Sequence, residues 1–432
     1  MNTSHAASDQ PRQRIAVVGA GIAGLACAWL LGRKHDVTLF EQASYAGGHT
    51  NTVDVTIGAV THPVDTGFLV HNEVTYPNLI ALFNHLGVVT QETEMSFSVS
   101  IERPDIEWSG SHLGTVFAQR RNLVRPAFLG MLRDILRFNK HARQYLQEVD
   151  PDTSLSELLD QHGYGRAMRD WYLLPMAAAI WSTSVKDMQR FPAHTFLVFC
   201  LNHHLLQVSG RPKWRTVVGG ARTYVQAMLR DIADVRLSQR LRTLRRTAHG
   251  VVLSVENRAD EPFDAVVMAC HAPQTLALLD ASEAEERVLE AFRYQPNEAV
   301  LHTDIGQLPR RPKTWAAWNY LSSVQVNQDR PVAVSYSINR LQPLPFEDEV
   351  IVTLNPVSAP DPAKVLARFQ YEHPVLDVEA VRAQARLHEI QGLDRVWFCG
   401  AWTRYGFHED GLVSALAVAR DFGVSAPWAP TP

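Results

Sequence analysis

The sequence predicts an α/β fold joined to a second, mixed α+β domain, and three observations lead to this prediction. The β-branched run Arg14–Val18 is typical of a buried strand, and the glycine-rich turn Gly19–Gly24 follows it directly. An apolar helical run at Leu25–Arg33 and a second strand at Val37–Phe40 complete a βαβ unit, which predicts a right-handed parallel crossover. Strand-like segments return in the middle and at the end of the chain, on either side of a long helical region.

The glycine turn carries a dinucleotide-binding fingerprint. Gly19 allows a tight turn, and Gly21 allows the backbone to approach a pyrophosphate closely. Gly24 allows the helix to pack closely on the strand. The helix N-terminus after the turn offers free N–H groups and a partial positive charge to phosphates. Glu41 ends the second strand at the separation expected of an acid that accepts hydrogen bonds from an adenosine ribose. The fingerprint therefore predicts a Rossmann-like domain, and by itself it leaves NAD and FAD open.

Both domains are predicted to be discontinuous, because nucleotide-type segments occur at the start, middle and end of the chain. The Rossmann-like domain, of the glutathione-reductase type, is assigned to residues 13–75, 208–278 and 388–428, and the mixed substrate domain to 76–207 and 279–387. Within them the pattern predicts helices at Tyr76–Leu86, Ala127–Val149, Ser154–His162 and Gly165–Ile180, and a final strand Arg395–Cys399 with a helix Gly411–Arg420.

Composition limits the classes of partner. A formal charge of −4 gives no basis for nucleic-acid binding. The four cysteines are scattered without a C-x-x-C pair, which predicts reduced thiols in a cytoplasmic protein. Histidines are numerous but form no metal-binding motif, so no metal site is predicted.

The segment Gly47-Gly48-His49, shortly after Glu41, resembles the flavin-containing amine oxidase superfamily, which also includes phytoene-type desaturases and some fatty-acid isomerases. In that family a Gly-Gly-Arg motif lies along the pyrophosphate and flavin. Here His49 replaces the arginine, so we expect one charged phosphate contact to be weakened or lost. The resemblance implies FAD as the cofactor.

The resemblance covers nearly the whole chain. Further segments that carry it are Val64–Phe68, Val218–Gly220, Arg240-Leu241, Phe263–Cys270, Phe398–Ala401 and Asp410–Ala415. The family's usual acid near Gly400 is absent, since Ala401 and Trp402 stand there. Segments Thr66–Pro77, Tyr172–Trp181 and Phe398–Gly411 are most similar to a bacterial NAD/FAD-binding branch related to the oxidase domain of plant cyclopropane fatty-acid synthases.

Together the fingerprint and the resemblance imply a set of site residues. The predicted cofactor-binding residues are Gly19, Gly21, Ile22, Ala23, Gly24, Glu41, Gln42, Gly47, Gly48, His49, Thr50, Gly67, Phe68, Leu241, Gly400, Ala401, Gly411 and Leu412. A helix beginning at Gly411 is expected to aim its N-terminus at the pyrimidine edge of the flavin, where it would stabilise the reduced form. In the preceding loop, Tyr405, Phe407 and His408 are the predicted catalytic residues, with Trp402 as a further wall residue and Glu409 as a further proton carrier.

Three features favour a hydrophobic substrate. The stretch Pro296–Ile305, which resembles the strand where amine oxidases place a lysine, contains none. Trp171–Trp181 and Phe196–Leu206 are apolar helices suited to line a channel between the domains, and Arg120–Arg143 is a basic amphipathic stretch suited to an anionic bilayer. We therefore predict an FAD-dependent oxidoreductase that desaturates or isomerises a lipid acyl chain, cytoplasmic, with peripheral contact to the inner membrane surface. An amine oxidase acting on a polar substrate and a catalytically silent flavoprotein subunit remain alternatives.

Overall fold

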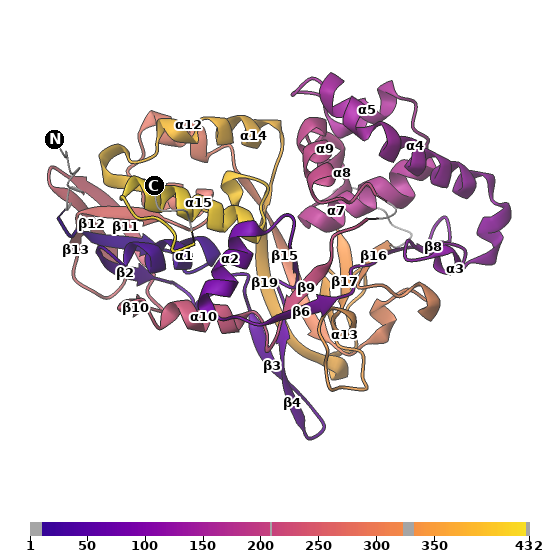
Figure 1. The fold of residues 1–432 in the computed structure, drawn as a ribbon, viewed down its shortest axis with the longest axis horizontal. Helices are drawn as coiled ribbons and strands as arrows, with labels where there is room; N and C mark the ends of the chain where they lie inside the picture. Colours follow the sequence, from indigo (N-terminus) through magenta and orange to yellow (C-terminus); the bar gives the residue numbers. More distant parts are fainter. Residues whose placement is uncertain (1–10, 208–209, 323–331, 429–432) are drawn as a thin grey trace, which may run out of the picture.

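A five-stranded parallel sheet forms one half of the computed structural model, which describes residues 11–207, 210–322 and 332–428 (Figure 1). Its strands are β1 (Arg14–Val18), β2 (Asp36–Phe40), β10 (Asp234–Arg236), β14 (Ala265–Met268) and β20 (Val396–Phe398). They lie in the order β10-β2-β1-β14-β20, and β1 pairs in parallel with both β2 and β14. The predicted Rossmann-like arrangement is confirmed, with strands contributed by the start, middle and end of the chain.

Two of the four helices of this half, α1 and α15, begin earlier than the sequence predicted. They are α1 (Ile22–Leu31), α2 (Pro77–Leu86), α10 (Arg222–Leu229) and α15 (His408–Asp421). Helix α1 was expected from Leu25, but the Leu25 amide already donates to the Gly21 carbonyl at 2.9 Å. Likewise α15 was expected from Gly411, whose amide donates to the Phe407 carbonyl at 3.1 Å. In both cases the first helical hydrogen bond reaches back into residues that the pattern had assigned to a turn or loop.

Helix α2 packs with this half, although the prediction placed residues from 76 onward in the substrate domain. Tyr76, Leu79, Leu82 and Phe83 are buried in the same core as α1 and α15. The carboxylate of Glu409, in α15, accepts hydrogen bonds from the N-terminal amides of α2. The position of α2 is therefore fixed by a cap from Glu409, a residue far away in the sequence. The predicted boundary between residues 207 and 208 falls on a segment outside the described residues.

The second half is built on a seven-stranded mixed sheet. Its strands are β7 (Phe97–Ile101), β8 (Ile106–Ser109), β15 (Arg293–His302), β16 (Trp318–Ser322), β17 (Ala333–Ser337), β18 (Ile351–Leu354) and β19 (Val365–Val375). The order is β19-β15-β18-β17-β16-β7-β8, and β7 and β16 are parallel neighbours. One face of the long strand pair β15–β19 turns toward the first half, so the two halves meet along it (Figure 1).

A helical lobe extends from the second half (Figure 1). It contains α3 (Leu113–Val116), the 3-10 helix η1 (Arg120–Val124), α4 (Pro126–Glu148), α5 (Leu155–Gln161), α6 (Arg166–Met168), the π-helix η2 (Arg169–Leu173), α7 (Leu174–Trp181), α8 (Val185–Arg190) and α9 (Ala193–Asn202). The single helix predicted over Gly165–Ile180 is therefore divided into three. Pro175 lacks the N–H that would reach the Trp171 carbonyl in a regular α-helix. That carbonyl instead accepts a hydrogen bond from Trp108 Nε1 at 3.2 Å.

Smaller elements connect the two halves. The remaining strands are β3 (Thr52–Ile57), β4 (Val60–Asp65), β5 (His71–Asn72), β6 (Thr90–Thr93), β9 (Trp214–Val217), β11 (Leu241–Thr247), β12 (Gly250–Val255) and β13 (Glu261–Phe263). The remaining helices are α11 (Ala272–Leu278), α12 (Glu283–Leu289), α13 (Ile338–Leu341) and α14 (Val378–Ala385). None of the described helices is long and apolar enough to cross a bilayer.

Candidate functional site

The first glycine turn packs so closely that only glycine fits its third position. A Cβ added to Gly24 would lie 1.8 Å from the Gly19 carbonyl oxygen, whereas a Cβ on Gly21 would meet nothing within 4 Å. Gly24 therefore serves the packing of α1 against β1, as predicted. Gly21 borders open space at the N-terminus of α1, where no side chain caps the free amides of Ile22 and Ala23.

The second glycine turn lies against the first. Gly47 forms a parallel bridge with Gly21, and its amide donates to the Ala20 carbonyl at 2.7 Å. A Cβ on Gly48 would come within 3.1 Å of the Gly21 Cα. We call Gly19–Gly24 together with Gly47-Gly48 the glycine cradle. Its side-chain-free backbone and the uncapped helix N-terminus suit a pyrophosphate group.

Glu41 closes one end of the glycine cradle. Its carboxylate oxygens accept hydrogen bonds from the Ala20 amide at 2.7 Å and from the Ala43 amide at 2.8 Å. Each oxygen retains a lone pair, so the carboxylate can still accept hydrogen bonds from a ribose. Gln239 donates its amide to the Glu41 carbonyl, which brings the start of β11, with Leu241, beside this end. Gln42 follows Glu41 with its side chain exposed.

His49 directly follows the glycine cradle and stacks on Tyr371, with ring centroids 5.0 Å apart. Its Nε2 atom is buried and has no hydrogen-bond partner among the residues that the structure describes. Burial, reinforced by His373, His271 and His408, holds the pKa of His49 well below its usual range. His49 is therefore neutral at pH 7. It cannot supply the charge of the arginine that the family carries here, and its unpaired ring nitrogen is available to a ligand.

His408 lies with Thr50 and Tyr224 in a hydrogen-bonded triangle. The Thr50 hydroxyl is 2.8 Å from His408 Nε2 and 2.5 Å from the Tyr224 hydroxyl, which is 3.1 Å from the same ring nitrogen. The His408 ring stacks on Phe68 at 3.8 Å. Burial, with a smaller effect of His71, lowers the pKa of His408 to about 3. The structure thus brings three predicted residues, Thr50, Phe68 and His408, into direct contact.

Five histidines from separate segments gather here, and we call them the histidine cluster: His49, His71, His271, His373 and His408. Burial lowers the pKa of His71 and His373 to about 4, and a second buried ring nitrogen, His71 Nδ1, has no partner. Burial also lowers the pKa of His271, which contacts Glu372 at 2.9 Å. The cluster is thus uncharged at pH 7.

Sequence reasoning missed several members of this site. His71, His271, His373, Tyr224 and Tyr371 were not singled out as site residues. Within the described residues, no three His, Cys, Asp or Glu side chains are grouped as metal ligands. The one sequence signal was the abundance of histidine, because the members come from segments that only the fold brings together.

The other predicted cofactor residues have mixed placements. Gly67 approaches His49 closely, since a Cβ there would lie 2.2 Å from the His49 carbonyl oxygen. Gly411 is inside α15, and its Cβ would press on Ile22 Cγ2 at 2.9 Å, so it packs α15 on α1 and does not begin the helix. Leu412 is fully buried in the core. Gly400 and Ala401 lie before α15, where the Gly400 amide donates to Ser414 Oγ at 2.9 Å.

Residues 402–410 divide between the two halves. Phe407 stacks on Phe199 of the helical lobe at 4.8 Å, and the Tyr405 carbonyl accepts a hydrogen bond from Trp181 Nε1. Trp402 is buried against Phe292, and its wall role stays a prediction. Glu409 was proposed as a proton carrier, but both its oxygens are occupied in capping α2. Of the three predicted catalytic residues, His408 lies in the histidine cluster, whereas Tyr405 and Phe407 contact the helical lobe.

The stretch Pro296–Ile305 falls mostly in β15, beside the histidine cluster. Asn297 Nδ2 is 3.0 Å from His373 Nδ1 and also donates to the Gln295 carbonyl. The Asn355 amide donates to Asn297 Oδ1 at 2.6 Å. The neutral side chain of Asn297 therefore contacts a neutral imidazole and a neutral amide at this point of the strand. A lysine here would introduce a charge.

Comparison with known proteins gives the family. A model of the flavin-containing amine oxidoreductases matches residues 22–302. The chain belongs to this family. A flavin cofactor is therefore implied, and the glycine cradle and the unpaired His49 and His71 nitrogens fit one. No curated protein sequence matches the chain.

Solved structures share the fold over almost the full length of the chain. A CLA-producing fatty acid isomerase from P. acnes has a TM-score of 0.69 at 15% identity, covering 97% of this chain and 100% of the isomerase. Cyclohexylamine oxidase from Brevibacterium oxydans IH-35A has a TM-score of 0.67 at 14% identity, with coverages of 96% and 100%. Wild-type putrescine oxidase bound to putrescine has a TM-score of 0.65 at 14% identity, with coverages of 95% and 99%. At these identities the likeness shows the fold alone.

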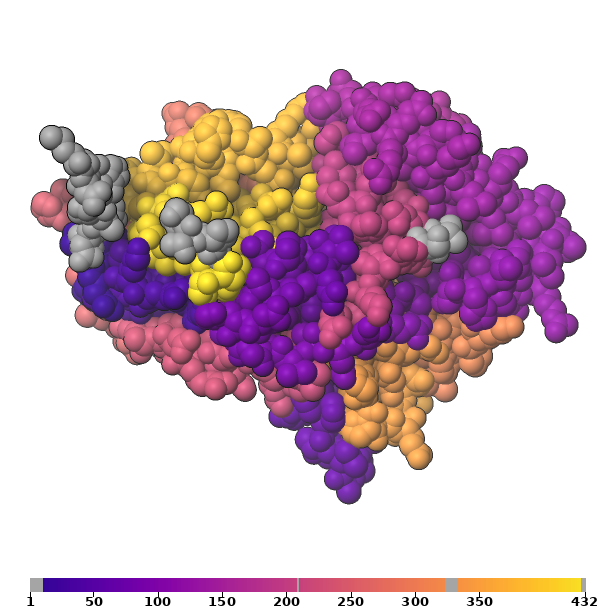
Figure 2. Space-filling model, viewed as in Figure 1, coloured from indigo at the N-terminus to yellow at the C-terminus, as the bar shows by residue number. Residues whose placement is uncertain are grey.

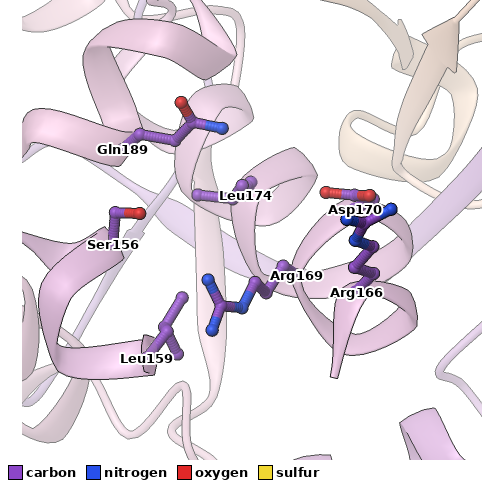
Figure 3. A pocket seen from close by; sticks show the side chains of 7 residues that line it. All are labelled: Ser156, Leu159, Arg166, Arg169, Asp170, Leu174 and Gln189. Carbon is purple, nitrogen blue, oxygen red and sulfur yellow. The ribbon is translucent and has the colours of Figure 1, made fainter. Parts of the chain in front are cut away.

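Two cavities lie outside the glycine cradle. One, of about 310 Å³, is in the helical lobe (Figure 3) and is lined by Ser156, Leu159, Arg166, Arg169, Asp170, Leu174 and Gln189. The other, of about 650 Å³, is lined by Pro273, Leu276, Ala277, Leu289, Glu290, Phe292, Arg293 and Tyr294. One of its lining residues, Tyr294, stacks on His271 of the histidine cluster at 4.2 Å.

Proposed function

We propose that this protein is an FAD-dependent oxidoreductase that moves hydride to or from an apolar carbon framework, with a lipid acyl chain as the substrate class. FAD would lie with its pyrophosphate on the glycine cradle and its adenosine ribose at Glu41. When bound, it supplies the capacity to accept and return a hydride. The chain's own residues bind the cofactor, position the substrate and exclude water.

The observation that carries this proposal is the neutrality of the histidine cluster. All five imidazoles have lowered pKa values, and the hydroxyls of Tyr224 and Tyr371 are held protonated by burial. A neutral lining imposes no charge-pairing requirement, which favours an uncharged substrate over an ammonium group. The absence of lysine from β15 supports the same conclusion.

The groove beside Tyr294 gives a second line of support. Six of its lining residues are apolar or aromatic, and Glu290 and Arg293 are the two that carry charge. Its lining residues come from α11, α12 and the start of β15. An elongated apolar molecule in this groove would have one section beside Tyr294, which stacks on His271. The fold of a fatty acid isomerase is also among those that the chain resembles.

Within this site His408 is the residue best placed to influence a proton transfer. Its hydrogen bonds to Thr50 and Tyr224 fix the ring orientation, and the stack on Phe68 holds its plane. Its low pKa keeps the ring neutral, so a proton would pass through it by exchange with the Thr50 and Tyr224 hydroxyls and would not rest on it as an imidazolium. We therefore assign to His408 the role of a positioned group in proton transfer.

Anaerobic reduction of the bound flavin tests the proposal. Purified protein should carry FAD and be bleached by a long-chain unsaturated fatty acid or phospholipid, or should isomerise its double bonds without net bleaching. Amines such as putrescine and cyclohexylamine serve as the matched panel. Bleaching by amines alone would replace the proposal with amine oxidation, and failure of every substrate together with an FAD-loaded protein would favour a silent flavoprotein subunit. If the protein binds no FAD even when the cofactor is supplied in excess, the proposal and these alternatives would all be contradicted.

A further inference from the structure

The surface formed by α3, η1 and the start of α4 exposes an unusual set of large apolar side chains. Leu113 is 77% exposed, Val124 81% and Leu136 59%, and Leu123 and Leu129 are also exposed. These five residues lie on one continuous segment at the outer edge of the helical lobe (Figures 1 and 2). Exposed apolar side chains gathered in one region mark an interaction site more often than isolated ones do.

Helix α4 shows how the segment is oriented. One face buries Phe128, Met131, Phe138, Ala142 and Tyr145 in the core of the lobe. The other face carries Leu129, Arg133, Leu136, Lys140 and Arg143, all exposed and spaced three or four residues apart. We call these five residues the basic stripe. Two leucines and three basic side chains therefore share one solvent-facing line.

The charge of this surface is mostly positive, although Asp105 pairs with Arg121 at its edge. Between residues 120 and 143 there are seven basic residues, Arg120, Arg121, Arg125, Arg133, Arg137, Lys140 and Arg143, and one acid, Asp134, which is buried. Some of the arginines serve the fold, since Arg137 donates to backbone carbonyls and stacks on Tyr164. Arg120, Lys140 and Arg143 form no ion pair with any residue in the described ranges.

We propose that this surface docks the protein on an anionic lipid bilayer. The leucine and valine side chains would enter the acyl boundary, and the basic side chains would lie at the level of the phosphates. Long arginine and lysine side chains suit this arrangement, because their apolar stems follow the inserted side chains while their charged ends stay with the headgroups. The inference does not depend on the proposed function.

A bilayer fits this surface better than a second copy of the chain. A two-fold contact would place the same residues against themselves, and the basic stripe contains no acid to pair with its arginines. A membrane supplies many anionic groups at once, together with an apolar layer for separate side chains. An acidic protein partner would also satisfy the charges, and vesicle binding distinguishes a bilayer from such a partner.

Vesicle co-sedimentation with the flavin-loaded full-length protein tests the inference. The probes are vesicles of phosphatidylcholine alone and of phosphatidylcholine with about one third phosphatidylglycerol. At low salt we expect at least about tenfold tighter binding to the anionic vesicles, and release at high ionic strength because salt screens the attraction. Equal binding to both vesicles, or none to either, would overturn the inference, and the latter would leave an acidic protein partner as the occupant.

Two sets of variants separate the contributions of charge and of apolar insertion. The combined change Arg133→Gln, Lys140→Gln and Arg143→Gln should remove most of the preference for anionic vesicles, about tenfold or more. Its matched control is Arg230→Gln, Arg245→Gln and Arg258→Gln, three exposed arginines of the other half. Val124→Ser with Leu136→Ser should weaken binding to a smaller degree, and Val89→Ser with Leu393→Ser is the control for exposed apolar residues elsewhere. Controls that weaken binding as much as the stripe variants would overturn the inference.

A labelling experiment gives a positive signal that does not depend on loss of binding. Three of the four native cysteines are buried and Cys270 is partly buried, so a surface cysteine can be labelled preferentially. An environment-sensitive dye at Val124→Cys should shift to the blue on addition of anionic vesicles. The same dye at Val89→Cys should not. Flavin reduction by soluble substrate should be unchanged in all these variants, which separates this result from that of the proposed function.

Discussion

The glycine cradle and the histidine cluster meet at His49, and the chain assembles them in different ways. The cradle comes from two short segments joined by the first βαβ unit, and each glycine has a local geometric reason. The cluster draws one histidine from each of five segments spread between residues 49 and 408. The predicted cofactor anchor is therefore encoded locally, whereas the proposed substrate side depends on how the two halves pack. Substitutions in the two regions should consequently have different effects.

Gly24→Ala should have the largest effect, and it acts on the cradle through the fold. The new Cβ would lie 1.8 Å from the Gly19 carbonyl oxygen, so α1 must move away from β1. We expect a loss of about 3 kcal/mol or more in the free energy of unfolding, together with loss of flavin, measured by urea denaturation and flavin absorbance. Gly21→Ala is the matched variant, because its Cβ enters open space. It should keep its stability but bind FAD more weakly, and equal destabilisation of both variants would contradict the assignment.

Acid should act mainly through the histidine cluster. His71, His373 and His408 have pKa values lowered to between about 3 and 4, whereas an unfolded histidine titrates near 6.5. Below about 6.5 the unfolded chain binds protons that the folded chain excludes, so stability falls by about 1.4 kcal/mol per pH unit for each such group. Asp65 and Asp410 oppose this trend below pH 6, because burial raises their pKa values to about 6. The urea concentration at the midpoint of unfolding should therefore decrease as the pH is lowered from 7 to 5.

Removing one histidine tests the source of this pH dependence. His71→Leu should flatten the decline in stability between pH 7 and pH 5, since one buried imidazole no longer needs to remain neutral. His249→Gln, at an exposed position, is the control and should leave the slope unchanged. An unaltered slope in His71→Leu would show that acid sensitivity originates outside the cluster.

Glu41→Ala should weaken the cradle without unfolding the protein. The amides of Ala20 and Ala43 would lose their acceptor, and the ribose would lose a charged partner. Hydrogen bonds to charged groups contribute about 1.5–3 kcal/mol, so FAD affinity should fall about tenfold or more. Quenching of flavin fluorescence measures the affinity, and Glu256→Ala, which removes an acid paired with Arg242, is the control. Unchanged affinity in a folded Glu41→Ala protein would show that another group holds the ribose.

Thr50→Val should have the smallest effect, and it acts where the two regions join. The valine removes the hydroxyl from the triangle with Tyr224 and His408, but leaves those two side chains 3.1 Å apart and bonded. We expect a loss of about 1 kcal/mol in stability and a slower flavin reduction at constant FAD content. Thr56→Val, on an exposed strand position, should change neither. An unaltered rate in Thr50→Val would separate His408 from the proton transfer.

The resemblance at Gly47–His49 was the most informative sequence signal about the family, and the matched family confirms it. It extended the fingerprint from a general dinucleotide site to a flavin site. The finer relation to a branch near the cyclopropane synthase oxidase domain stays a prediction. So do the roles of Tyr405 and Phe407, which the structure places beside the helical lobe.

The sequence by itself determined the βαβ unit, the glycine cradle and Glu41, because strand period, glycine spacing and the acid at the strand end are short-range features. It also placed most of the helices that it predicted to within a few residues, since apolar periodicity is local. Only the tertiary structure decided that α15 begins at His408, that Glu409 caps α2, and that five histidines lose their charge together. Those outcomes depend on desolvation and on hydrogen-bond partners supplied by residues far away in the chain, which no local pattern records.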